Sequence, residues 1–405
     1  MTSEHFDSTE SWLRLAWSMA AGTVASVGMW AVVLVLPQIQ ESFSVDRAGA
    51  SATFTAAMVG FAIGNVALGR LVDRFGIASV LAIAGLVIAA CFWASAQAQT
   101  IWQLVALQGV LGIATAAGFG PLIADLSHWF LRRRGIAVAA AACGNYLAGA
   151  IWPQILKSTI AEDGWRPAFE LVAIIVVIAS LPLAFALRRR APALETAANP
   201  GNGSGVRRIP ADLGMSPTTL QLLLMIAGLG CCIAMSMPQV HIVAYCADLG
   251  YGLAAGAEMV SLMLAAGVIS RLASGYVADY IGGVRTLLLG SFFQGLALFL
   301  YIPFDGLASL YVVSLVFGLA QGGIVPSYAI IVREYLPARE AGQRVGIVIM
   351  ATVIGMAIGG WMSGWIYDLT GSYRAAFLNG IAWNLVNIAV MLFLLQRGRP
   401  RLAAA

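Results

Sequence analysis

The sequence predicts an all-α membrane protein with twelve transmembrane helices arranged in two pseudo-symmetric six-helix bundles. The first observation is composition: of 405 residues, 60% are hydrophobic and only 10% are charged, whereas a soluble domain is about 25% charged. The second is a series of apolar runs long enough to cross a bilayer, which takes about 20 residues of helix. The 44 glycines fit helices that pack closely in lipid. A water-soluble protein is excluded.

The apolar runs define twelve spans. Irregular backbone that faces lipid is unfavourable, so each run is expected to be helical. The expected spans are 13–37, 49–71, 77–97, 101–127, 135–157, 166–188, 217–246, 254–278, 284–303, 307–333, 341–366 and 373–396.

The distribution of arginines predicts the orientation. The loops on one side carry most of them, including Arg132 to Arg134 and Arg188 to Arg190, and the loops on the other side carry only Arg47, Lys157, Arg166 and Arg374. Positive residues favour the cytoplasmic side, so both termini are expected there. The arginine-rich, lysine-poor composition favours the inner (plasma) membrane of a bacterium as the location. The acidic start "MTSEHFDSTESW" does not resemble a signal peptide, so the first span is expected to be retained.

A hydrophilic stretch divides the chain in the middle. "RRRAPALETAANPGNGSGVRRIPADLGMS" is rich in Pro, Gly, Ser and Asn, which is typical of a flexible linker. The expected organisation is a six-helix bundle over residues 1–188, a cytoplasmic linker over 189–216 and a second six-helix bundle over 217–405.

The two halves repeat each other. "GRLVDRFG" at 69–76 matches "GYVADYIG" at 275–282 with an offset of 206, and the same offset places Gly112 on Gly318. "DGWRPAF" at 163–169 returns as "GSYRAAF" at 371–377. Parallel six-span repeats are found in transporters whose substrate site lies between the halves near mid-membrane.

These motifs carry a resemblance to known families. The two loop motifs resemble the loop signature of the major facilitator superfamily. "WFLRRRGIAVAAAACG" at 129–144 is similar to the fifth-span signature of the monocarboxylate transporter family, and "HIVAYCADLGYG" with "SRLASGYVAD" resembles that family's seventh and eighth spans. The resemblance covers all twelve spans and implies transport of a small monocarboxylate by a carrier that commonly works as a monomer.

The chain departs from that family at its charged positions. The first span, "ASVGMWAVVLVLPQI", has no charge, and Gly267 stands one turn before Arg271 where the family typically has an aspartate. These departures affect the residues that the family uses for proton coupling. The related oxalate–formate exchangers add a lysine in the eleventh span, and this chain has none there, so the resemblance argues against a dicarboxylate that needs two cations.

Arg271 is the sharpest functional signal. It lies eight residues before Asp279, or ~12 Å inside the bilayer at 1.5 Å per residue. A charge at this depth is costly, and a guanidinium offers two parallel donors that fit a carboxylate. We expect Arg271 to bind the substrate's carboxylate; the alternative is a structural ion pair with Glu258 or Asp125.

Three residues are candidates for proton coupling. His241 lies in the seventh span, and its side chain titrates near neutral pH; the alternative is a hydrogen-bonded interfacial histidine. Asp248 and Glu258 are further candidates, although solvation in loops also explains both.

Polar and aromatic residues in cavity-lining spans are candidates for a pocket beside Arg271. Taken singly, each also fits ordinary helix packing. These substrate-site candidates are His241, Asn145, Tyr146, Trp152, Gln321 and Tyr328.

A last group is expected to act as a conformational gate. Asp73, Arg74 and Asp279 belong to the loop motifs and are expected to pair with arginines or helix ends in one access state only. Arg132, Arg133 and Arg134 are expected mainly to anchor the topology, and their position also permits a gate contact.

The function predicted from these residues is secondary active transport of a small organic anion, such as lactate or pyruvate, with a proton as co-substrate. The alternative is a major facilitator exporter of an amphiphilic drug or metabolite, with Arg271 structural. No protease, hydrolase or nucleotide-binding motif is present, so neither an enzyme nor a primary pump is expected. We expect no cofactor, no metal and no nucleic acid; the partners are the substrate, the proton and the lipid bilayer.

Overall fold

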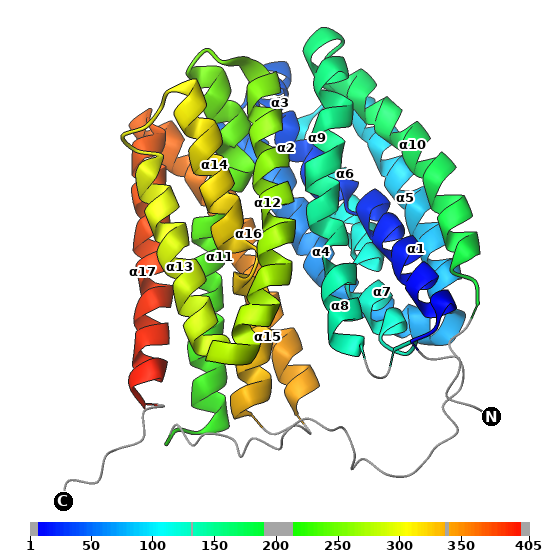
Figure 1. Cartoon of the computed structure of the whole chain (residues 1–405). Coiled ribbons are helices and arrows are strands. Elements are labelled where there is room, and N and C mark those ends of the chain that lie inside the picture. The colour runs from blue at the N-terminus through cyan, green and yellow to red at the C-terminus, as the bar shows by residue number, and fades with distance from the viewer. Residues whose placement is uncertain (1–6, 131–132, 190–213, 337–339, 398–405) are drawn as a thin grey trace, which may run out of the picture.

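The apolar runs form membrane-length helices in the computed structural model of the chain (Figure 1). The structure describes residues 7–130, 133–189, 214–336 and 340–397. Within these residues, twelve helices are long and apolar enough to cross a membrane, so the predicted fold class is confirmed. They cover Thr9–Leu34, Arg47–Val72, Ile77–Ala96, Ile101–Leu126, Ile136–Glu162, Trp165–Ala186, Pro217–Asp248, Gly252–Ile281, Gly283–Leu300, Leu307–Tyr335, Gly342–Thr370 and Tyr373–Arg397.

The elements fall into two groups along the chain. The N-terminal group contains α1 (Thr9–Ala25), α2 (Val27–Leu34), α3 (Leu36–Phe43), α4 (Arg47–Phe75), α5 (Ile77–Ala96), α6 (Ile101–Thr115), the 3₁₀ turn η2 (Ala116–Gly118), α7 (Gly120–Leu126), α8 (Arg134–Ala142), α9 (Gly144–Glu162) and α10 (Trp165–Ala186). The C-terminal group contains α11 (Pro217–Asp248), α12 (Gly252–Ile281), α13 (Gly283–Leu300), α14 (Leu307–Gln321), α15 (Ile324–Tyr335), α16 (Ala341–Thr370) and α17 (Tyr373–Arg397).

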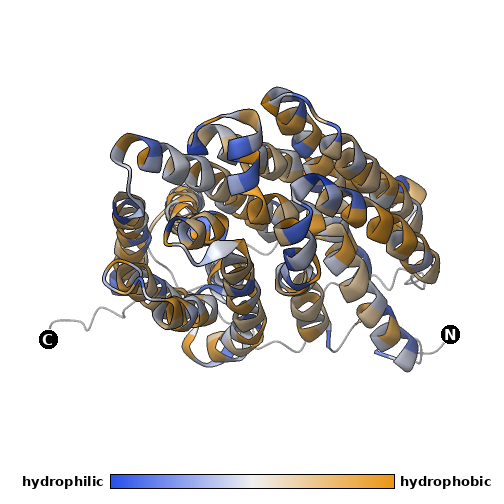
Figure 2. Ribbon diagram, turned by 90° about the horizontal axis from the view of Figure 1, so that it is seen from above, coloured by the Kyte–Doolittle hydropathy of each residue, from blue (hydrophilic) through white to orange (hydrophobic). Residues whose placement is uncertain are grey.

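The two ends of the molecule differ in what they carry. Figure 1 shows the start of α1, the end of α10, the start of α11 and the end of α17 toward the bottom, which we call the linker end. The start of α4 and the end of α11 lie at the opposite end, which we call the far end. Residues 190–213 of the expected linker lie outside the described residues. Figure 2 shows hydrophobic residues around most of the helices, as a lipid environment requires.

Short polar residues begin several of these helices. The side chains of Asp46 and Ser216 accept hydrogen bonds from the main-chain N–H groups of Gly49 (2.7 Å) and Thr219 (3.1 Å). These are N-caps, which satisfy N–H groups that have no partner within the helix.

The repeat seen in the sequence is present in three dimensions. The motifs that close α4 and α12 both end in a left-handed glycine, Gly76 with φ +82° and Gly282 with φ +84°. A side chain on Gly112 would collide with the main chain of Ala57, and one on Gly318 would collide with that of Met263. The two colliding pairs are related by the same offset, so the close approach of α4 to α6 recurs between α12 and α14.

Several spans are interrupted, which the apolar pattern does not reveal. The first is divided at Ser26 and Val35, the fourth by η2, the fifth at Cys143, and the tenth between Gln321 and Ile324. These interruptions expose main-chain carbonyls inside the molecule, where side chains can reach them.

The close approach of α4 and α6 gives a testable prediction. In Gly112→Ala the new methyl would lie 2.8–3.0 Å from the main-chain carbon atoms of Ala57, so the helices must move apart and stability should fall by roughly 1–3 kcal/mol. Gly346→Ala is the matched control, because that position has no atom within 4 Å and alanine favours a helix. Thermal unfolding in detergent should show a loss for the first variant and none for the second; equal melting temperatures would contradict the packing.

Candidate functional site

Arg271 of α12 lies between the two groups of helices and is only 7% exposed. Its Nη1 donates to the carbonyl of Ala142 (2.7 Å), in the N-terminal group, and its Nε donates to the carbonyl of Gly322 (3.3 Å), in its own group. The guanidinium carbon lies 4.0 Å from the centre of the Tyr146 ring, which is a cation–π contact.

Both carbonyls come from interrupted helices. Ala142 is the last residue of α8, and Gly322 follows the end of α14. The breaks in the fifth and tenth spans therefore position the arginine from both sides.

The arginine has no carboxylate partner among the described residues. Asp125 accepts an ion pair from Arg14 (2.7 Å), and Glu258 accepts one from Lys157 (2.6 Å). The alternative that Arg271 pairs with Glu258 or Asp125 is therefore wrong for this structure. The charge of Arg271 is held by two dipoles and one aromatic ring and remains formally uncompensated.

Gly267 makes room for the ring of Tyr146. A side chain at position 267 would collide with that ring. An aspartate at position 267, typical of the monocarboxylate transporter family, would therefore displace the tyrosine ring that contacts the guanidinium.

The other fifth-span candidates, Asn145 and Trp152, form hydrogen bonds with residues of the first span. Trp30 Nε1 donates to both the main-chain and side-chain oxygens of Asn145 (3.0 Å each). Trp152 Nε1 donates to the carbonyl of Thr23 (3.0 Å). These contacts join α9 to α1 and α2 and fix the wall that carries Tyr146.

The two tenth-span candidates, Tyr328 and Gln321, have different hydrogen-bond partners and lie in different surroundings. Tyr328 donates to Asn387 (2.9 Å) within a buried network of the C-terminal group, so it has a structural partner. Gln321 pairs with Gln239 of α11 (2.6 Å), next to the Gly322 carbonyl that Arg271 binds.

His241 is buried near the far end and does not contact Arg271. Its Nε2 lies 2.7 Å from the carbonyl of Gly360, which can only accept, so Nε2 carries the hydrogen. Its Nδ1 then accepts from the hydroxyl of Tyr373 at 3.2 Å. The neutral histidine links α11 to α16 and α17.

A network around Arg47 joins the two groups at the far end. Arg47, at the start of α4, donates from Nη2 to Asp248 (2.5 Å) and from Nη1 to the hydroxyl of Tyr373. Its guanidinium carbon lies 3.9 Å from the centre of the Tyr367 ring. We call Arg47 with Asp248, Asp368, Tyr367 and Tyr373 the far-end latch.

Asp368 completes the latch through the main chain. Its carboxylate accepts from the N–H groups of Arg47 (3.0 Å) and Ala48 (2.8 Å), so a residue of one group caps a helix of the other. The positive end of the α4 dipole favours this carboxylate.

A second ion pair joins the two groups at the same end, between two other helices. Lys157 of α9 pairs with Glu258 of α12, whose other oxygen accepts from Tyr311 (2.6 Å). The explanation of Asp248 and Glu258 as loop-solvated carboxylates is therefore wrong: both are bound to cations of the other group.

Contacts between the groups diminish toward the linker end. Gly364 and Gly360, near the far end, face Arg47 and Phe54 across the interface. At Gly69, Gly275 and Gly346, by contrast, a side chain would meet no neighbouring atom of the described residues within 4 Å. The ribbons of the two groups also diverge at this end in Figure 1. Arg271 binds Ala142 at the end of α8, on the linker side of these contacts.

The gate residues that the structure describes lie at the linker end. Asp279 and Arg74 are exposed, and neither has an ion-pair partner among the described residues. Arg133 uses its main-chain N–H to bind Asp7 (3.1 Å). Arg132 and the side chains of Asp73 and Arg134 lie outside what the structure describes.

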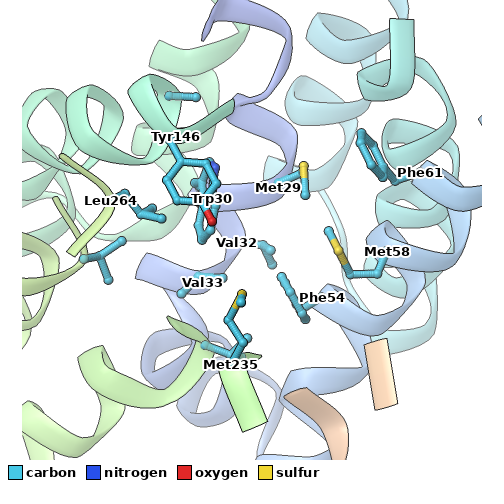
Figure 3. Close-up of a cluster of buried hydrophobic side chains, with 14 of the residues drawn as sticks. Met29, Trp30, Val32, Val33, Phe54, Met58, Phe61, Tyr146, Met235 and Leu264 are labelled. Carbon is cyan, nitrogen blue, oxygen red and sulfur yellow. The ribbon is translucent and has the colours of Figure 1, made fainter. Parts of the chain in front are cut away.

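Apolar side chains fill the interface between Arg271 and the far-end latch. Figure 3 shows them pointing toward one another from helices of both groups. They include Met29, Trp30 and Val33 of α2, Phe54 and Met58 of α4, Met235 of α11 and Leu264 of α12, each at most 5% exposed. Leu264 lies two turns before Arg271 on α12 and Phe54 lies two turns after Arg47 on α4, so this cluster occupies the interface between the arginine and the latch.

Sequence reasoning missed Arg47 and Asp368 as interface residues and Gln239 as the buried partner of Gln321. In the sequence Arg47 stands out only as a charge that bears on topology, since its partners are about 200 and 320 residues away along the chain. The repeat motif at 371–377 contains Tyr373 and is the one available signal that this region is built for a specific role.

These features define a two-bundle membrane protein with an uncompensated cation between its bundles and an ionic closure at one end. The Major Facilitator Superfamily model matches residues 19–309 and 247–405. The chain belongs to this superfamily and is a transporter of that class, with a small-molecule substrate.

Similar proteins carry two kinds of name. A Bos taurus protein named monocarboxylate transporter 13 is 26% identical over 344 residues, covering 84% of this chain and 79% of the relative. The agnestins efflux protein AgnL12 of Paecilomyces divaricatus is 23% identical over 359 residues, covering 87% and 80%. A crystal structure of a bacterial homologue of the human lysosomal transporter Spinster, described as inward-facing and unoccupied, shares the fold with a TM-score of 0.68, 12% identity and 96% coverage of each chain.

The far-end latch can be tested by labelling. Ser51 is 1% exposed and lies against Gly364, so a cysteine introduced there should react slowly with an impermeant maleimide. Arg47→Gln or Asp368→Asn should raise the labelling rate about tenfold, since hydrogen bonds to charged groups contribute roughly 1.5–3 kcal/mol. Arg374→Gln removes an exposed far-end charge outside the latch and should leave the rate unchanged. Labelling that stays slow in both latch variants would show that other contacts close this end.

Proposed function

We propose that this protein transports a small monocarboxylate by alternating access, with Arg271 as the carboxylate site. The observation that carries the proposal is a buried guanidinium without a carboxylate partner among the described residues. A substrate carboxylate supplies the missing charge, and the fork of donors suits it. Its arrival would also compete with the Ala142 carbonyl for Nη1, which links binding to the contact between the two groups.

The proposed transport cycle follows from which end of the molecule is closed. With the linker end in the cytoplasm of a bacterial inner membrane, as the arginines predict, closure by the latch at the far end would correspond to an inward-facing state. Substrate binding at Arg271 favours the opposite state only if it stabilises that state more than this one. The exposed Asp279 and Arg74, together with Asp73, would then pair as the linker end closes.

Proton coupling is assigned to the carboxylates at the far end. Asp248 and Glu258 hold Arg47 and Lys157 across the interface, and their side chains are 30% and 38% exposed. A proton that enters from the far side would neutralise either carboxylate and weaken the closure. His241 contacts the same network through Tyr373.

The second candidate is export of an amphiphilic compound. The apolar, methionine-rich cluster of Figure 3 favours it, because methionine adapts to varied ligands, and so does the efflux relative. In that case Arg271 has a structural role in joining the fifth and tenth spans.

Uptake into proteoliposomes distinguishes the two functions. Radiolabelled pyruvate and lactate should accumulate under an inward proton gradient, and Arg271→Gln should lose at least about tenfold of the rate, because it removes a charge-assisted contact of roughly 1.5–3 kcal/mol. Arg285→Gln, which removes a charge at the linker end away from the site, is the matched control and should transport normally. Size-exclusion chromatography in detergent checks folding.

Two outcomes would contradict monocarboxylate transport through Arg271. If wild-type protein moves neither acid, monocarboxylate transport is wrong. If Arg271→Gln transports normally and cationic amphiphiles are also moved, the exporter is the better description.

A further inference from the structure

Two buried glutamines meet at the centre of the C-terminal group. Gln239 of α11 is 2% exposed and Gln321 of α14 is fully buried. Gln239 Nε2 donates to Gln321 Oε1 at 2.6 Å.

Each amide uses only one of its polar ends. Gln239 Oε1 and Gln321 Nε2 have no hydrogen-bond partner within the described part of the chain. Turning both amides around, so that oxygen and nitrogen exchange places, leaves the same result: one donor and one acceptor stay free. Buried polar groups in native proteins are almost always paired, so this free pair indicates a ligand or a water that completes it.

The pair is attached to the Arg271 site. Gln321 is the last residue of α14, and the next residue, Gly322, gives its carbonyl to Arg271. Gln239 lies one turn after Met235, a member of the apolar cluster that the two groups share. Gln321 therefore adjoins the helix interruption whose carbonyl binds Arg271, and Gln239 is joined to it through Gln321.

We propose that the Gln239–Gln321 pair binds a hydroxyl group of the transported anion. This inference rests on the proposed function, in which Arg271 binds the carboxylate. A hydroxyl both donates and accepts, so it satisfies the free oxygen and the free N–H together. A carbonyl only accepts and leaves the free oxygen unpaired, and an unsubstituted chain leaves both atoms unpaired. The pair thus selects a hydroxy acid over the matching oxo acid, and the oxo acid over the matching unsubstituted acid.

The test compares three acids of the same carbon number: lactate, pyruvate and propionate. Uptake efficiencies are measured in proteoliposomes for the wild type, Gln321→Leu and Gln239→Leu. In the wild type we expect lactate to exceed propionate by about tenfold, the effect of one to two hydrogen bonds, with pyruvate between them. In both leucine variants propionate uptake should persist and the ratio should fall toward one.

Gln108→Leu is the matched control. Gln108 is a fully buried glutamine of the N-terminal group whose amide also lacks a partner among the described residues. It lies on α6, apart from the Arg271 interruption, so this variant should keep the wild-type ratio.

The outcomes separate this inference from the proposed function. If the wild type moves all three acids with equal efficiency, or the leucine variants keep the full preference, the hydroxyl site is overturned while monocarboxylate transport stands. If none of the three acids is moved, the proposed function itself fails.

Discussion

The burial of one guanidinium between two helix groups is the constraint around which this structure is arranged. A charge at this depth in a membrane must meet dipoles or an opposite charge. Arg271 meets the carbonyls that the fifth and tenth spans release where their helices break, and the face of Tyr146. Gly267 is needed so that the tyrosine fits. These contacts stabilise the guanidinium without neutralising its charge, and the remaining positive charge favours the binding of an anion.

The far-end latch closes one of the two ends from which an anion could approach this cation. Arg47 and Asp368 bind across the interface through both side chain and main chain, and the apolar cluster lies between them and Arg271. In the proposed cycle the anion therefore reaches the arginine from the linker end. The same contacts must break when the other side opens, so their strength sets the balance between two states rather than the fold itself.

Much of this architecture is readable in the sequence, because lipid allows few backbone solutions. The spans, the repeat and the isolated Arg271 follow from hydropathy and from offset motifs such as Gly112 and Gly318. The partners of Arg271 do not, since helix interruptions at Cys143 and Gly322 leave no mark on an apolar pattern. The pairing of Arg47 with Asp248 and Asp368 depends on contacts across the whole chain, and the burial of His241 depends on α16 and α17 closing over it.

Direct binding tests the central claim that Arg271 is an anion site left open by the fold. Equilibrium binding of radiolabelled pyruvate to detergent-purified protein, measured without a membrane or gradient, separates recognition from the conformational cycle. The wild type should bind saturably, and Arg271→Met, which keeps much of the length of the side chain but removes its charge, should show no saturable binding while eluting as a folded protein. Equal binding by the two would contradict the account and leave Arg271 as a structural link between interrupted helices.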